Sequence, residues 1–155
     1  MGCWHEQALI EAPVEEVWEL IGDPRRYPEW VGDEVLDVTG LPTVQKGAEF
    51  DQTTRNPFGK NTTRFEIVEL EDLHEIRMRC LSSGWYSHWK LTEAGGSTFA
   101  DVEIGMEPLS VGYKALDKAA GKRWYRRVAQ ASLDGIKRAV ASSRRTPAPA
   151  PEQQR

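Results

Sequence analysis

The sequence has few of the residues that build metal centres or disulfide scaffolds. Its 155 residues include two cysteines, Cys3 and Cys80, and three histidines. Two cysteines form no disulfide framework, and we expect both to be reduced thiols. The histidines are His5, His74 and His88. Their spacing is not typical of metal ligands, so the sequence predicts no metal site.

Long apolar runs are also missing. No stretch approaches the ~18 consecutive apolar residues of a membrane-spanning helix, and the N-terminus lacks the apolar segment of a signal peptide. We therefore expect a cytoplasmic protein without an integral membrane segment. No glycine-rich phosphate loop or dinucleotide fingerprint is present, so the sequence predicts no cofactor.

The net charge of −4 is distributed unevenly. Residues 1–113 carry nine basic and 21 acidic side chains, whereas residues 114–143 carry eight basic and two acidic ones. One interpretation is a solvated basic helix lying on an acidic sheet. The alternative is a basic strip for an anionic ligand, a nucleic acid or a lipid headgroup. Because the acidic remainder would repel phosphates and no nucleic-acid motif is present, we expect no nucleic-acid partner.

Two short helical segments are predicted between residues 13 and 30. Pro13 suits the first position of a helix, where its missing N–H costs nothing. Apolar residues then recur at helical spacing up to Gly22, which ends the helix. Asp23-Pro24 begins a second helical turn, which we expect to end at Tyr27-Pro28.

The period of the apolar residues changes to two in the middle of the chain, which is typical of strands. Short turn sequences separate six such segments, and a seventh extended run precedes the first helix. Short connections make consecutive strands antiparallel neighbours. The predicted strands are about 4–12, 34–40, 47–55, 61–71, 74–81, 84–93 and 97–106.

A long helix is predicted over about residues 113–142. Its apolar residues form two stripes on different faces, and we expect its two halves to bury different sides. The first stripe comprises Leu116, Ala120, Trp124, Val128 and Ala131. The second comprises Ala129, Leu133, Ile136 and Val140. Residues 144–155, rich in proline and alanine, are expected to form a disordered tail after a single domain of residues 1–143.

These elements predict an α+β helix-grip fold with the order β-αα-β6-α. A seven-stranded antiparallel sheet must cover its apolar face, and the long C-terminal helix is the only element large enough to do so. We expect the sheet to curl around this helix and to leave a pocket between them.

The alternation along each strand predicts which side chains face that pocket. They are mostly apolar, with a few neutral polar groups, as binding of a hydrophobic small molecule requires. The inner face supplies neither an obvious carboxylate pair nor a Ser–His–Asp set. The predicted ligand-binding residues are Trp30, Phe50, Gln52, Phe65, Met78, Trp85, Ser87, Trp89, Val102, Leu116, Ala120 and Trp124.

Some of these residues have a second interpretation. Trp85, Trp89 and Trp124 could equally be core residues, and we expect Trp30 at a rim, since amphipathic aromatic residues favour boundaries. Arg127 falls near the pocket-facing stripe, where it would either extend into solvent or bind a ligand carboxylate or enolate. If the protein catalyses a reaction, the candidate catalytic residues are Arg127, Ser87 and Thr63.

The segment from Ala12 to Trp30 resembles the START/Bet v 1-like (SRPBCC) superfamily. The resemblance rests on Ala12-Pro13, Glu15, Val17-Trp18, Leu20, Asp23, Tyr27-Pro28 and Trp30. Within that superfamily the chain, over about residues 4–142, is similar to the bacterial polyketide cyclase/dehydrase-like group. The resemblance implies a helix-grip fold with a deep hydrophobic cavity between the sheet and the C-terminal helix.

The same resemblance implies a range of functions, because the superfamily includes lipid and quinone carriers, hormone receptors, aromatase/cyclases and chaperone activators. We expect binding of a lipid, isoprenoid, quinone or polyketide for transport, sequestration or sensing. The alternatives are a polyketide cyclase or dehydratase that holds its substrate in the same cavity, and a protein-interaction module. We expect a monomer or a weak homodimer.

Overall fold

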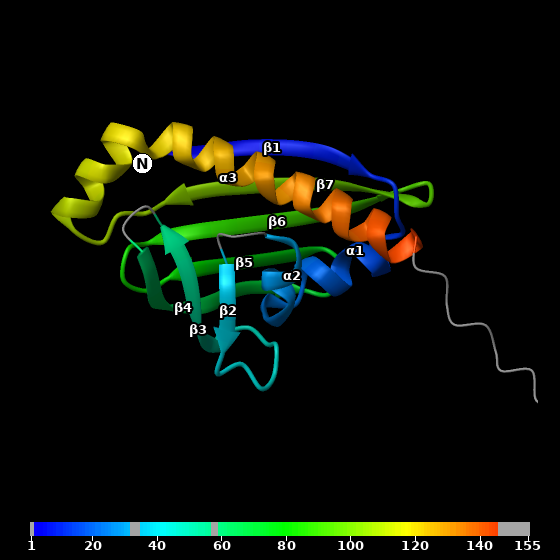
Figure 1. Cartoon of the computed structure of the whole chain (residues 1–155), viewed down its shortest axis with the longest axis horizontal. Helices are drawn as coiled ribbons and strands as arrows, with labels where there is room; N and C mark the ends of the chain where they lie inside the picture. Colours follow the sequence, from blue (N-terminus) through cyan, green and yellow to red (C-terminus); the bar gives the residue numbers. More distant parts are fainter. Residues whose placement is uncertain (1, 32–34, 57–58, 146–155) are drawn as a thin grey trace, which may run out of the picture.

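The computed structural model of the chain describes residues 2–31, 35–56 and 59–145, and Figure 1 shows its elements. The N-terminal part contains β1 (Cys3–Ile10), α1 (Val14–Ile21), the 3-10 helix η1 (Pro24–Arg26) and α2 (Tyr27–Trp30). The strands that follow are β2 (Val35–Thr39), β3 (Glu49–Asn56), β4 (Gly59–Glu71), β5 (Glu75–Cys80), β6 (Trp85–Ala94) and β7 (Ser97–Met106). The chain continues in α3 (Val111–Arg145).

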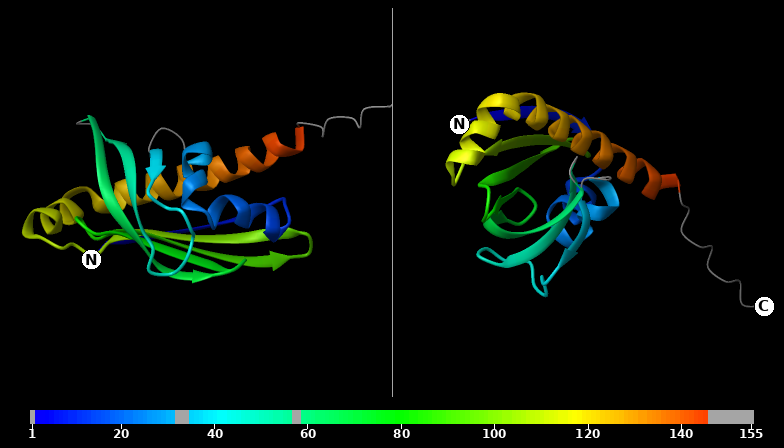
Figure 2. Two further views of the ribbon diagram at one scale, coloured as in Figure 1. Left: turned by 90° about the horizontal axis from the view of Figure 1, so that it is seen from below. Right: turned by 60° about the vertical axis from the view of Figure 1, so that its left-hand side comes forward.

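All seven strands belong to one antiparallel sheet in the order β1-β7-β6-β5-β4-β3-β2. The meander from β2 to β7 therefore follows the chain, and β1 pairs with the last strand. The sheet curves around α3 without closing, as the two views in Figure 2 show. The predicted helix-grip fold and element order are confirmed.

The helices between β1 and β2 differ in detail from the prediction. Pro13 is extended (φ −59°, ψ 150°) and caps α1 from outside instead of occupying its first turn. The second helical segment does not end at Tyr27-Pro28, because α2 continues to Trp30. Pro28 lies in the first turn of α2, where no helical hydrogen bond requires its N–H.

The predicted orientation of α3 is right for its second half and wrong for its first half. Ala129, Leu133, Ile136 and Val140 are buried as expected, whereas the first predicted stripe is exposed at its start. One continuous stripe faces the sheet, made of Gly121, Tyr125, Val128, Ala129, Ser132, Leu133, Ile136 and Val140. We expected Leu116 and Ala120 to face the sheet. Leu116 is 43% exposed and Ala120 is also exposed, so neither residue packs against the sheet.

A contact between distant parts of the chain explains this rotation. The Tyr125 hydroxyl donates to Asp117 Oδ1 at 2.6 Å, and the Gly2 backbone N–H donates to Asp117 Oδ2 at 3.0 Å. Asp117 and Tyr125 therefore face the start of β1. Leu116 and Ala120 lie on another side of α3, which faces away from β1. The predicted tail begins two residues too early, because α3 includes residues 144 and 145. The rest of the tail lies outside the described residues, as does residue 34, where a strand was expected to begin.

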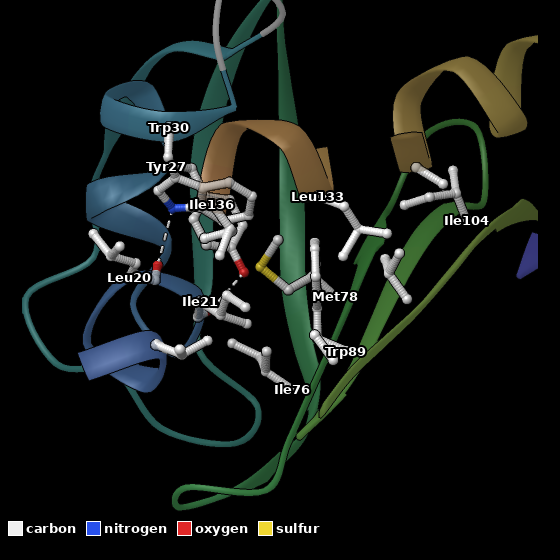
Figure 3. Packing of buried hydrophobic residues seen from close by; sticks show 14 of the residues in the cluster. Leu20, Ile21, Tyr27, Trp30, Ile76, Met78, Trp89, Ile104, Leu133 and Ile136 are labelled. Carbon is white, nitrogen blue, oxygen red and sulfur yellow. Dashed lines mark hydrogen bonds between the residues drawn. The ribbon is translucent and has the colours of Figure 1, made fainter. Parts of the chain in front are cut away.

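α1, α2 and the C-terminal half of α3 pack against the concave face of the sheet (Figure 3). The Trp30 ring packs edge-on against the Trp89 ring, with 5.6 Å between the centroids. Trp30 Nε1 donates to the Leu20 carbonyl at 3.1 Å, and the Tyr27 hydroxyl donates to the Ile21 carbonyl at 2.8 Å. Both aromatic side chains thus bury their polar atoms with a partner, and the two hydrogen bonds join α2 to the end of α1.

Charged side chains lie on the convex face, as the alternation predicts. Arg64 pairs with Glu49 and Asp51, and Arg79 pairs with Glu66. The eight Lys and Arg side chains of residues 114–143 are all exposed. Within the described part of the chain none of these eight forms an ion pair with the sheet, which agrees with a solvated basic helix.

Removing one buried hydroxyl tests how the turn before α1 is held. Thr98 is fully buried, and its Oγ1 donates to the Ala12 carbonyl at 2.8 Å. Thr98→Val keeps the shape of the side chain but leaves this buried carbonyl without its donor, so we expect a loss of about 1–2 kcal/mol in the free energy of unfolding. Urea denaturation measures it. The control is Thr92→Val, at an exposed position of β6, which we expect to change stability by less than about 0.5 kcal/mol. Equal effects of the two substitutions would contradict this account.

Candidate functional site

Seven of the predicted ligand-binding residues are buried in the structure. They lie on the concave face or on α2 and have little contact with solvent. Phe50 and Val102 are 0% exposed and Trp89 is 2% exposed, so almost none of their surface can be reached by solvent. The seven residues are Trp30, Phe50, Gln52, Phe65, Met78, Trp89 and Val102. In this structure the six apolar members of this set pack as core.

The expectation that Trp30 lies at a rim is wrong. Its side chain is 3% exposed and contacts Tyr27 and Trp89 edge-on. The hydrogen bond from its indole N–H to the Leu20 carbonyl replaces the water that a rim position would supply.

The concave face remains accessible at Ser87. This residue lies in β6, and its cross-strand neighbours are Met78 on β5 and Ile104 on β7, both nearly fully buried. Strands pair with β6 on both sides and Ser87 shares its face with Trp85 and Trp89, so solvent reaches this partly exposed residue from the concave side. α3 therefore does not cover the whole inner face.

Two tryptophans stand beside this accessible position. The Trp85 ring lies 4.6 Å from the Trp124 ring and 5.6 Å from the Tyr125 ring, measured between centroids, and both tryptophans are partly buried. Ala120 and Leu116 precede Trp124 by about one and two turns on the same side of α3. Their exposure leaves an apolar strip of the helix uncovered.

We refer to this part of the molecule as the open end. It contains the predicted residues that retain accessible surface at the end of the sheet where β5 ends and β6 begins, and on the first half of α3. Its members are Thr63, Trp85, Ser87, Leu116, Ala120 and Trp124.

A buried acceptor without a donor lies next to Thr63. Gln52 on β3 is paired with Thr63 on β4 and is 6% exposed. Its Oε1 has no hydrogen-bond partner among the described residues. Since buried polar atoms in proteins almost always have partners, the donor to this atom comes from outside the chain, either a water molecule or a polar group of a bound molecule.

The sequence analysis did not include the Cys80 thiol among the candidate site residues, although it lies at the open end of the sheet. Cys80 ends β5, opposite Phe65 on β4, and its Sγ lies 3.2 Å from the Ser82 hydroxyl. Burial alone would raise the pKa of the Cys80 thiol, but hydrogen bonds from Ser82 and Ser83 hold that pKa below its ordinary value. The sequence Cys80-Leu-Ser-Ser-Gly84 indicates these hydrogen bonds, because serine side chains in the turn after a strand can bond to the last side chain of that strand.

Arg127 does not reach into the concave face. It is exposed on α3, next to the buried Val128, which agrees with the interpretation that it extends into solvent. Of the three candidate catalytic residues, Ser87 and Thr63 lie at the open end and Arg127 lies apart from them.

Tyr125, which the sequence analysis overlooked, is fully buried behind Trp85 and Trp124.

A groove of about 480 Å³ lies elsewhere on the molecule. It is formed by α1, α2 and the end of α3 and shares only Trp30 with the predicted ligand-binding set. Glu16, Glu19, Arg26 and Arg138 are among the side chains that line it. Apolar ligands are bound mainly by apolar walls, so this charged groove is poorly suited to a hydrophobic molecule.

No helix in the described part of the chain is both long and apolar enough to cross a membrane. The family model described as polyketide cyclase/dehydrase and lipid transport matches residues 1–141. A comparison with curated proteins gave no match.

Solved structures share the fold at low sequence identity. A START superfamily protein from Mycobacterium smegmatis has a TM-score of 0.71 and 14% identity over 91% of this chain and 98% of its own. A protein from Nitrosomonas europaea has a TM-score of 0.70 and 15% identity over 93% and 97% of the two chains. The protein XoxI from Bacillus cereus has a TM-score of 0.69 and 14% identity over 93% and 99%.

Proposed function

The chain belongs to the polyketide cyclase/dehydrase and lipid transport family, and from that premise we propose that it binds a hydrophobic small molecule at the open end. The bound molecule is a lipid, isoprenoid, quinone or polyketide, taken up for transport, sequestration or sensing. The observation that carries the proposal is Ser87, a small polar residue that stays accessible in the middle of an apolar concave face.

The open end supplies the contacts that such a ligand needs. Trp85 and Trp124 offer aromatic surface, and Leu116 and Ala120 offer apolar surface that is exposed without a ligand. Covering apolar area contributes roughly 25 cal/mol per Å², from which the cost of ordering the ligand is subtracted. Gln52 Oε1 is available to accept a hydrogen bond from a ligand hydroxyl, and the Thr63 and Ser87 hydroxyls can orient a carbonyl.

A reaction on a polyketide at the same place is the second candidate. It is supported by three polar side chains, Thr63, Cys80 and Ser87, on the concave face near the open end. Holding a poly-β-keto chain in a folded form brings its reacting carbons together and requires little acid–base chemistry from the protein. Turnover of a model poly-β-keto substrate that depends on Ser87 would favour this candidate over simple binding.

Filling the open end should abolish binding. We expect palmitate, decylubiquinone, geranylgeraniol or emodin to change the tryptophan emission of the wild-type protein, because Trp85 and Trp124 line the site. Ser87→Phe places a ring in the accessible space and should weaken the affinity for each binding probe by at least about 100-fold, or roughly 2.7 kcal/mol. The measurement is a fluorescence titration of both proteins.

The matched control places the same ring on the other face of the same strand. Thr92→Phe changes an exposed position of β6 on the convex face and should leave the affinity unchanged. The absence of any emission change with all four probes, or equal affinities of Ser87→Phe and wild type, would contradict the proposed site.

A further inference from the structure

Three potential metal ligands meet on the convex face, on the side of the sheet opposite the open end. The ligand atoms of Cys3, His5 and Glu103 lie within 4.8 Å of one another. His5 Nε2 is 2.9 Å from Glu103 Oε1. Glu103 lies about 100 residues after Cys3 and His5, so no spacing motif links the three.

The pairing of β1 with β7 creates this group. Cys3 and His5 are two residues apart on β1 and so point to the same side of the sheet. His5 is directly opposite Glu103 on β7, and Cys3 is opposite Gly105. Because Gly105 has no side chain, the Cys3 side chain and the Tyr86 hydroxyl can lie directly over β7. A Cβ at Gly105 would be 2.9 Å from the Cys3 Cβ and 2.8 Å from the Tyr86 oxygen.

A second carboxylate lies near the imidazole of His5. Its other ring nitrogen, Nδ1, faces Asp101 Oδ1 at 3.6 Å, and Gln7 Nε2 donates to Asp101 Oδ2 at 2.9 Å. Metal-bound histidines commonly direct their second nitrogen at a carboxylate in this way. The other oxygen of Glu103, Oε2, lies 4.0 Å from His88 Nδ1, and His88 Nε2 lies 2.6 Å from Glu75 Oε1.

We propose that Cys3, His5 and Glu103 bind a zinc-class divalent cation. A thiolate, an imidazole and a carboxylate are the three ligand types that zinc takes in proteins, with bonds of about 2.0–2.3 Å. Tetrahedral geometry needs donors about 3–4 Å apart, which small side-chain rotations supply from the present arrangement. Binding releases the Cys3 thiol proton to solvent, and water completes the fourth position on the exposed side.

This site is independent of the proposed hydrophobic ligand, since it lies on the opposite face of the sheet. Its direct test is a titration of the reduced protein with Co²⁺. We expect a thiolate-to-cobalt charge-transfer band that one equivalent of Zn²⁺ abolishes. Cys3→Ser should remove the band, whereas Cys80→Ser should keep it, because Cys80 lies on the concave face.

Two histidine substitutions, His5→Ala and His74→Ala, provide a second test variant and its control. Isothermal titration with Zn²⁺ should show at least a tenfold weaker affinity for His5→Ala than for wild type. His74→Ala, at an exposed position in the turn between β4 and β5, should bind Zn²⁺ as wild type does. The proposal is overturned if no charge-transfer band appears, if the band is lost with Cys80 instead of Cys3, or if both histidine variants weaken binding equally.

Discussion

Gly84→Ala should destabilise the protein by about 3 kcal/mol or more, which corresponds to a fall of roughly 10 °C in Tm. Gly84 has φ +82°, a conformation that costs an alanine energy. A Cβ at this position would lie 1.8 Å from the Glu107 carbonyl oxygen, which is backbone and cannot rotate away. The turn would have to open, and Gly84 joins both Cys80 and Glu107 through backbone hydrogen bonds of 3.0 and 2.9 Å.

Gly95→Ala separates the two contributions. Gly95 also has a positive φ, +58°, but no atom lies within 4 Å of the position that the new methyl group would take. Gly95→Ala should therefore lower the free energy of unfolding by only about 1 kcal/mol, because only the backbone conformation is unfavourable for alanine. Thermal denaturation followed by circular dichroism measures both variants. If Gly84→Ala is no less stable than Gly95→Ala, the close approach of the 81–84 turn to Glu107 is not as described.

Gly135→Ala should lower the free energy of unfolding by about 3 kcal/mol, although alanine is the better helix former. The added Cβ would lie 1.9 Å from the Trp30 carbonyl oxygen, so α2 would have to move away from α3. Trp30 could not then keep its contact with Trp89, which packs at the centre of the core. The absence of a side chain at Gly135 thus allows the backbone of α2 to contact the backbone of α3 directly.

The control for Gly135 lies in the same helix. Gly112 has the Ser110 Oγ as its nearest neighbour, at 3.9 Å, so a methyl group meets no obstacle there. Gly112→Ala should leave stability unchanged or raise it by up to about 1 kcal/mol. Chemical denaturation of the two variants gives the comparison. Gly135→Ala at wild-type stability would show that α2 and α3 do not meet as closely as the structure has them.

The sequence predicts the strands and their faces well because both depend on neighbours along the chain. The alternation in Phe50-Asp-Gln52 or Trp85-Tyr-Ser87 assigns each side chain to a face without knowledge of the partner strand. Turn residues such as Gly95-Gly96 mark where strands end. The fold follows from these local signals, since one long helix must cover one apolar face.

The rotation of α3 and the extent of the open end depend on contacts that no local pattern encodes. Asp117 meets Gly2, 115 residues earlier, and this contact decides that Leu116 and Ala120 stay exposed. Whether Phe50 or Trp89 adjoins a space depends on how the side chains of α1, α2 and α3 fill the concave face. The group of Cys3, His5 and Glu103 likewise requires the register of β1 with β7.

The most direct test of the central claim maps where a bound hydrophobic molecule lies. Palmitate with a photoreactive diazirine on its chain would be crosslinked to the wild-type protein and the modified peptides identified by mass spectrometry. We expect modification in residues 85–90 of β6 and 113–124 of α3, with competition by unlabelled palmitate. Modification confined to the groove at residues 16–30 and 135–143, or spread evenly over the chain, would contradict it.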